Sequence, residues 1–86
     1  MDDNITYGVF WKNIHFVDDE WHPFMTWLLS YDDAYKTALE AADNPSTYDV
    51  KIVERVETYT GVCHITKYDN KKAAIEAWNR RATDER

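Results

Sequence analysis

The sequence predicts an α+β fold in which a four-stranded, mainly antiparallel sheet carries two helices on one face. Two observations support this prediction. Segments typical of strand, strand and helix follow one another twice along the 86 residues, and the composition is 44% hydrophobic and 15% aromatic, which supplies the large apolar side chains that one small core needs. We therefore expect a single domain over residues 1–86, with residues 83–86 as a frayed polar tail.

The first two predicted strands form a hairpin. Residues 5–11 are rich in β-branched and aromatic side chains, and Asn13 is a plausible turn residue before a second run at residues 14–17. The acidic residues that follow cannot be buried unpaired, so we expect an exposed turn or bulge there. The second strand then continues through residues 21–29, where Pro23 indicates a sheet edge because proline has no N–H to donate.

A helix is predicted directly after this hairpin. Ser30 can cap its N-terminus, and Asp32 and Asp33 place negative charge at the positive end of the helix dipole. Pro45 ends the helix, because a proline disfavours helical conformation in the residue before it. Spacings of three and four residues define one apolar face, which comprises Tyr31, Ala34, Tyr35, Ala38, Leu39 and Ala42.

The second half repeats the same order of elements. Apolar and charged residues alternate through residues 48–57, as in a strand with one face in water, and Thr60 with Gly61 is the expected reversal. Residues 62–68 form the returning strand, and Asp69 or Asn70 caps the last helix. The apolar face of that helix, which we expect to pack against the sheet, comprises Ala74, Trp78 and Ala82.

The charge balance disfavours nucleic acid as a partner. The formal net charge is −6, and each bound phosphate needs a Lys or Arg to replace its counterions. A single cysteine excludes an intramolecular disulfide and fits a reducing compartment. The sequence has no apolar run of signal-peptide or membrane-spanning length, so we expect a cytoplasmic protein without membrane contact.

The residue inventory predicts no catalytic residues, no metal site and no cofactor. Cys63 and His64 are neighbours on a predicted strand, so their side chains point to opposite faces and cannot pair as thiolate and imidazole. The three histidines lack the spacing of a zinc site, and two glycines are too few for a phosphate-binding loop. The acidic stretch lacks the spaced donors and glycine of a calcium loop. We therefore predict a protein that is not an enzyme.

Aromatic residues crowd into the first hairpin. Alternate side chains of a strand point to opposite faces, so a two-layer domain cannot easily bury all of them under its helices. The alternative is that most pack in the core. Because aromatic side chains next to acidic ones are typical of protein-binding hot spots, we predict a partner surface that comprises Trp11, Asp18, Asp19, Glu20 and Trp21.

Residues 73–82, which read AAIEAWNRRA, resemble the end of small bacteriophage and prophage proteins of the restriction-alleviation (Lar) family. In that family a similar helix closes a zinc-ribbon-like domain with paired CxxC motifs, whereas this chain has only Cys63. The resemblance implies a phage or mobile-element accessory protein. Such proteins often bind and inhibit host enzymes, including restriction and CRISPR systems, in the bacterial cytoplasm.

Two functions follow as hypotheses. The first is a protein-binding module that modulates a host defence complex or a nucleic-acid-processing complex. The second is a nucleic-acid binder that stacks bases on aromatic side chains of the sheet. In that alternative, the phosphate contacts come from the basic residues of the second half, which are Lys51, Lys67, Lys71, Lys72, Arg80 and Arg81.

Overall fold

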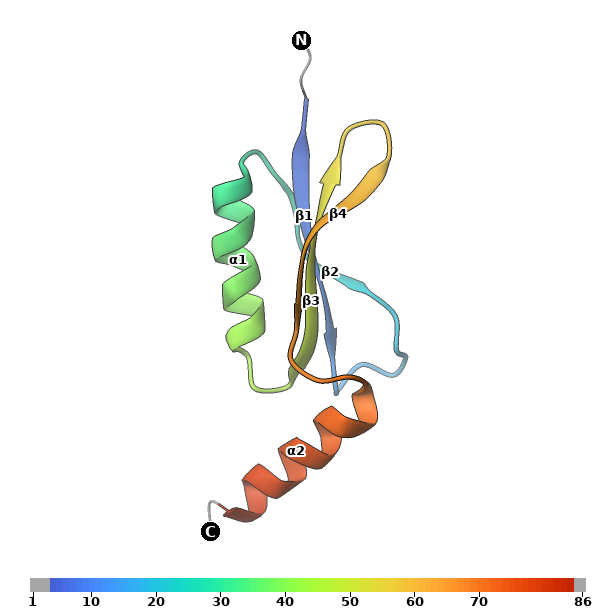
Figure 1. Cartoon of the computed structure of the whole chain (residues 1–86), viewed down its shortest axis with the longest axis vertical. Coiled ribbons are helices and arrows are strands. Elements are labelled where there is room, and N and C mark those ends of the chain that lie inside the picture. Colours follow the sequence, from blue (N-terminus) through green and yellow to red (C-terminus); the bar gives the residue numbers. More distant parts are fainter. Residues whose placement is uncertain (1–3, 85–86) are drawn as a thin grey trace.

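The computed structural model of the chain describes residues 4–84, and its side chains through residue 80. Two strand–strand–helix units follow one another in the chain (Figure 1). The elements are β1 (Thr6–Asn13), β2 (His22–Leu28), α1 (Tyr31–Asp43), β3 (Thr47–Arg55), β4 (Tyr59–Thr66) and α2 (Lys71–Asp84).

The four strands form one antiparallel sheet in the order β2-β1-β3-β4. The central register places Val9 of β1 opposite Ile52 of β3, and Ile52 opposite Cys63 of β4. β2 lies at an edge, as Pro23 indicated. The predicted α+β fold with a four-stranded antiparallel sheet is confirmed.

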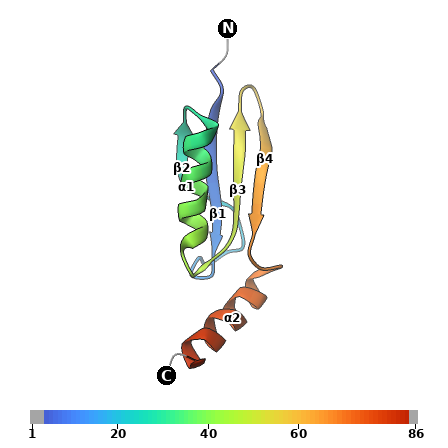
Figure 2. The same cartoon turned by 60° about the vertical axis from the view of Figure 1, so that its left-hand side comes forward.

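Helix α1 covers one face of the sheet (Figure 2). Three of its alanines, Ala34, Ala38 and Ala41, are fully buried and pack against Val9, Val50 and Ile52. Small side chains let the helix backbone approach the sheet closely, while the β-branched strand residues fill the space between them. The predicted cap of α1 is confirmed, because the Ser30 side chain accepts a hydrogen bond of 3.1 Å from the Asp33 N–H.

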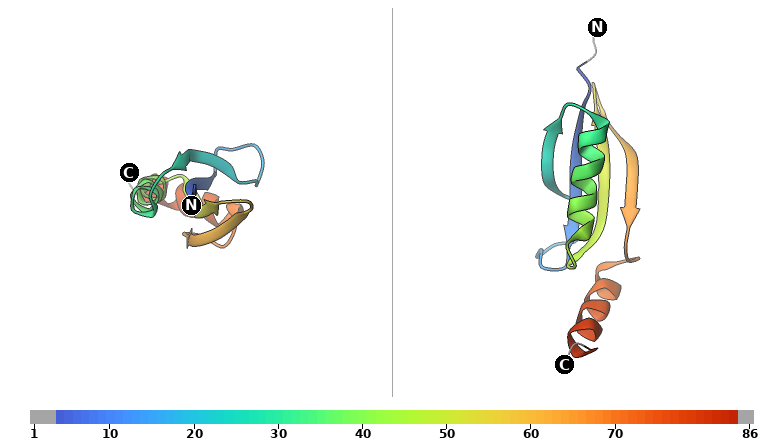
Figure 3. Two further views of the ribbon diagram at one scale, coloured as in Figure 1. Left: turned by 90° about the horizontal axis from the view of Figure 1, so that it is seen from above. Right: turned by 90° about the vertical axis from the view of Figure 1, so that its left-hand side faces the viewer.

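Helix α2 takes a position different from the expected one. It continues beyond the end of the sheet, and the described residues span 56 Å along the long axis against 22 Å and 17 Å across it (Figures 1 and 3). Its contacts are with the β1–β2 loop: the ring of Trp78 lies 5.7 Å from that of His15, and Lys71 Nζ donates to the Phe16 carbonyl.

The connection before α2 explains this direction. The N–H groups of Lys67 and Tyr68 both donate to the Tyr48 carbonyl, at 3.1 and 3.3 Å. Asn70 then caps the helix by accepting from the Ala73 N–H at 2.8 Å. These hydrogen bonds hold both ends of the short connection. The helix therefore leaves the sheet and does not turn back over it.

Two turns also differ from the prediction. Residues 14–17 are not a strand, because Asn13 bonds the Ser46 side chain and the His15 N–H and so turns the chain away from the sheet. The β3–β4 reversal lies at residues 56–58, and Gly61 lies inside β4 at a register shift. α2 runs to Asp84 and so includes the first two residues of the expected tail; residues 85–86 lie outside the described part.

Candidate functional site

The predicted partner residues do not form one surface. Trp11 lies on the α1 side of the sheet, where its ring contacts Phe16 at 5.4 Å and Phe24 at 4.8 Å and packs against the core. Trp21 lies on the opposite side of the sheet, beside Lys12 of β1 and Lys51 of β3. The sheet therefore separates the two tryptophans that the sequence had suggested as neighbours.

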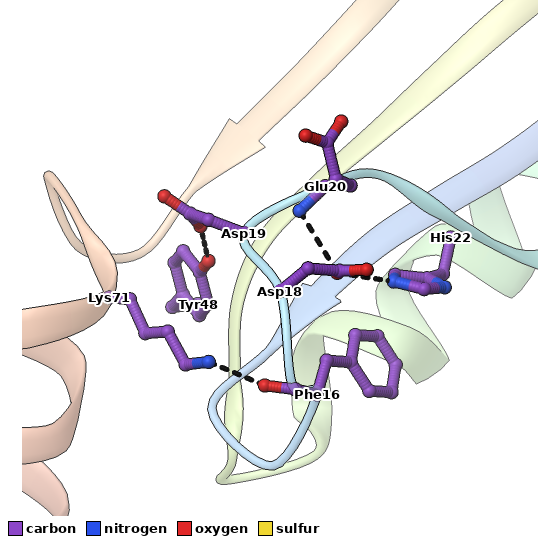
Figure 4. A network of polar contacts seen from close by, with 7 residues as sticks. All are labelled: Phe16, Asp18, Asp19, Glu20, His22, Tyr48 and Lys71. Atoms are coloured by element: carbon purple, nitrogen blue, oxygen red, sulfur yellow. Dashed lines mark hydrogen bonds and ion pairs between the residues drawn. The ribbon is translucent and has the colours of Figure 1, made fainter.

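The acidic loop is engaged in internal contacts (Figure 4). Asp18 Oδ1 lies 2.7 Å from His22 Nε2 and accepts from the Glu20 N–H at 3.2 Å, and the hydrogen bond with His22 is the main reason that the pKa of Asp18 is lowered. Asp19 accepts a hydrogen bond from the hydroxyl of Tyr48. The Glu20 carboxylate points away from this network. Two of the three acids thus order the loop.

Within residues 4–84, no helix lies over the face of the sheet opposite α1 (Figure 3), and we call it the open face. The Trp27 ring lies over Gly8 of β1 on this face, with its centre 6.0 Å from that of Phe10 and 5.5 Å from that of Tyr59. Gly8 makes that position possible, because a Cβ there would lie 2.6 Å from Trp27 Cζ3. Aromatic side chains of three strands thus form one layer, and Gly8 leaves the room that this layer needs.

Cations accompany the tryptophans of the open face. Lys12 Nζ and Lys51 Nζ lie 4.8 and 4.6 Å from the ring centre of Trp21, and Arg55 Cζ lies 5.0 Å from that of Trp27. Such contacts contribute about 0.5–1 kcal/mol each at exposed sites. They orient the cationic groups over the open face, although the chain as a whole carries a net charge of −6.

A pocket of about 210 Å³ opens on this face beside Trp21 and Lys51. Ligand sites for drug-sized molecules are larger, roughly 300–1,000 Å³, so this pocket has room for one planar ring or one side chain. Tyr59 at its rim is 67% exposed. The pocket is lined by Phe10, Trp21, Lys51, Val53 and Tyr59.

Sequence reasoning missed this pocket, although a signal was present. The same alternation that places Val9, Val50 and Ile52 in the core places Phe10, Lys12, Lys51 and Val53 on the other face. Phe10 and Lys51 are cross-strand partners. Reading both faces of β1 and β3, rather than the core face alone, would have found the floor of the pocket.

A polar cluster beside the pocket does not form a catalytic relay. Asp49 Oδ1 and Thr66 Oγ1 both lie on the Nε2 atom of His64, at 2.6 and 3.2 Å. A hydroxyl nucleophile relay requires the two partners on different ring nitrogens. Cys63 packs on the core side while His64 is exposed, which confirms that these neighbours point apart.

The described residues contain no group of three or more His, Cys, Asp or Glu side chains placed to hold a metal ion. Within the same part of the chain, every helix is too short or too polar to span a bilayer. No family model, curated protein or solved structure matches the chain. Function is therefore inferred from the residues of the open face.

Proposed function

We propose that this protein is a non-enzymatic binding module that recognises another protein through the open face of its sheet. The observation that supports the proposal is the uncovered pocket of about 210 Å³ between Trp21 and Tyr59, with Lys51 at its edge. Because residues 73–82 resemble the end of Lar-family proteins, we further propose that the protein is a phage or mobile-element accessory protein. Its partner would then be a host protein of the bacterial cytoplasm, such as a component of a restriction or CRISPR system.

The chemistry of the open face suits a protein partner. Trp, Tyr and Arg are the residues most enriched in binding hot spots, and this face carries Trp21, Trp27, Tyr59 and Arg55. An apolar side chain that fills the pocket contributes about 1.5–3 kcal/mol by leaving water. Carboxylates on the partner would pair with the exposed cations and would mainly raise the association rate.

The proposal retains only part of the surface expected from the sequence. Trp21 stays in the binding surface because it lines the pocket. Trp11 packs against the core, and Asp18 and Asp19 hold the loop that carries Trp21, so we assign these three to positioning. Glu20 is exposed beside Trp21 and belongs to the rim.

The experiment is affinity capture of the tagged full chain from a bacterial lysate, with identification of the retained proteins. We expect Trp21→Ala and Tyr59→Ala to lose the partner that the parent retains. Val17→Ser is the matched control, because Val17 is fully exposed and lies outside the pocket. Recovery of the same partner by all variants, or of no partner above background by the parent, would contradict the proposal.

A second candidate function is the binding of single-stranded nucleic acid, and the specific observation in its favour is the pairing of aromatic rings with Lys12, Lys51 and Arg55. Of the basic residues expected to contact phosphates, Lys51 lines the pocket. Displacing counterions at three cations gives a slope of log affinity against log salt of roughly −2. Fluorescence anisotropy with labelled DNA and RNA strands tests this, and absence of binding at low salt excludes it.

A further inference from the structure

A second uncovered surface lies on the other side of the sheet, between α1 and β4. Helix α1 lies over the other strands and leaves β4 clear (Figures 2 and 3). Along this flank of α1, Tyr31, Tyr35 and Leu39 are 39, 42 and 46% exposed. Cys63 and Ile65 of β4 are half-buried and pack against the same core that α1 covers. We call these five residues the α1–β4 strip.

The spacing of the helix residues shows that the strip is continuous. Tyr31, Tyr35 and Leu39 follow one another at intervals of four, so they form one row along the helix. The first two rings stack with centres 6.2 Å apart. A hydrogen bond with Cys63 raises the pKa of Tyr31, which puts the first residue of the row within reach of β4.

The protein's own α2 does not cover the strip. Its direction is set by the two hydrogen bonds from the connection to the Tyr48 carbonyl and by the Asn70 cap, and it runs away from the sheet. α2 also uses its apolar face only in part. Ala74 is 4% exposed, whereas Ile75, which flanks this face, is 37% exposed. The strip and α2 are thus two partly uncovered apolar surfaces of one chain.

The two helices carry opposite charge. α1 has Asp32 and Asp33 in its first turn and Glu40 and Asp43 toward its end, with Lys36 as its one cation. The first turn of α2 has no acid, and its basic side chains include Lys71, Lys72 and Arg80. An antiparallel alignment places the start of α2 beside the end of α1, so that Lys72 faces Asp43. It also opposes the two helix dipoles, which is the favourable arrangement.

We propose that the α1–β4 strip binds α2 of a second copy of this chain. The two copies would meet at the ends of the sheets from which the α2 helices leave, related by a twofold axis, with each α2 antiparallel to the partner's α1. A helix of 14 residues is about 21 Å long, and the row from Tyr31 to Leu39 extends about 12 Å, so one α2 can cover it. A twofold axis makes the contact twice, which doubles the buried apolar area.

The first test is the oligomeric state of the full chain, measured by analytical ultracentrifugation from about 1 to about 200 μM, a range that captures micromolar dissociation constants. We expect a dimer for the parent. Tyr35→Glu and Ile75→Glu change exposed residues on the two sides of the contact and should each give a monomer. Val17→Glu introduces the same charge at a fully exposed loop position and should leave the dimer intact.

Circular dichroism establishes that each variant is folded. A parent that is monomeric throughout the concentration range would overturn the proposal, as would a folded Tyr35→Glu variant that dimerises like the parent. Because the open face lies on the other side of the sheet, these results are independent of partner capture. A variant that loses the dimer but still captures the partner protein separates the two proposals, as does a variant that keeps the dimer but no longer captures the partner.

A charge exchange distinguishes a second copy from a helix that folds back on its own chain. Asp43→Lys and Lys72→Glu each place like charges at both contacts of a dimer and should weaken self-association by roughly tenfold. In an equimolar mixture, each contact of the mixed dimer pairs opposite charges, so we expect parent-like affinity. If mixing restores nothing, α2 does not bind the strip of a second chain and the proposal fails.

Discussion

The clearest test of the open face is a single methyl group at Gly8. A Cβ at this position would lie 2.6 Å from Trp27 Cζ3 and 2.9 Å from Phe10 Cε1. Both distances are too short, so Gly8→Ala must displace the indole from its place across β1. Gly61 is a matched control in the same sheet, because a Cβ there meets no atom within 4 Å.

The magnitude follows from the contacts that Trp27 would lose. Its ring pairs with Phe10 and Tyr59 are worth about 0.5–1.5 kcal/mol each, and its contact with Arg55 about 0.5–1 kcal/mol. Against this loss, replacing glycine with alanine stabilises by about 0.4–1 kcal/mol through the unfolded chain, equally in both variants. Allowing for partial relaxation of the indole, we expect Gly8→Ala to be less stable than Gly61→Ala by about 2 kcal/mol.

The assay is urea unfolding followed by circular dichroism, which does not depend on indole emission. The same Gly8→Ala change in a Trp27→Ala background should cost much less, because the Phe10 ring alone then remains within 3.0 Å of the added Cβ. Indole emission of Gly8→Ala should move to longer wavelength as Trp27 enters water. If the two glycine variants agree within about 0.3 kcal/mol, or if the full cost persists without Trp27, the aromatic layer is not packed as described.

Three further predictions concern the core, α2 and the acidic loop. Ala38→Leu should destabilise the fold by about 1–3 kcal/mol in the same unfolding assay, because Ala38 is fully buried on the sheet side of α1 and the site cannot accommodate added atoms. An unchanged midpoint of unfolding would show that α1 is loosely packed. Trp78→Ala should cost about 1–2 kcal/mol, well below the loss of about 3–5 kcal/mol typical of a fully buried tryptophan, because Trp78 is half-buried against His15. The pKa of Asp18 is lowered in the folded state, mainly by its hydrogen bond with His22. Asp18 therefore stabilises the fold above its unfolded pKa, and this contribution is lost as the pH falls through its folded pKa. The difference in melting temperature between the parent and Asp18→Asn should shrink toward acid pH, and a constant difference would contradict the assignment.

Local signals predicted most of the elements. Ser30 and the three-and-four spacing of apolar residues located α1, because a cap and a periodic face act within one segment. The alternation of β3 located its core face for the same reason. The position of α2 was not predictable in this way. The phase of Trp78 shows which side of the helix is apolar, but not whether the sheet or a loop will cover it.

The candidate site was partly predictable for a related reason. Trp11 and Trp21 are close in sequence, but the loop formed by residues 14–21 breaks the alternation between them, so their faces could not be derived by counting. Trp21 lies outside the core cluster, and the charged groups over its ring are cations rather than the acids that are its neighbours in sequence. That pairing depends on the β1–β3 register, which connects residues about 40 positions apart and leaves no local sequence pattern.

The two hydrogen bonds to the Tyr48 carbonyl have a mechanical consequence. Tyr48 is buried in β3, its carbonyl holds the connection to α2, and its hydroxyl holds Asp19 in the loop that carries Trp21. Tyr48 therefore links two parts of the molecule. Its side chain holds the loop that carries Trp21, and its main chain holds the connection to α2. A displacement of the loop at Trp21 is therefore transmitted to the base of α2 through Tyr48, in addition to the direct contacts that Lys71 and Trp78 make with the loop.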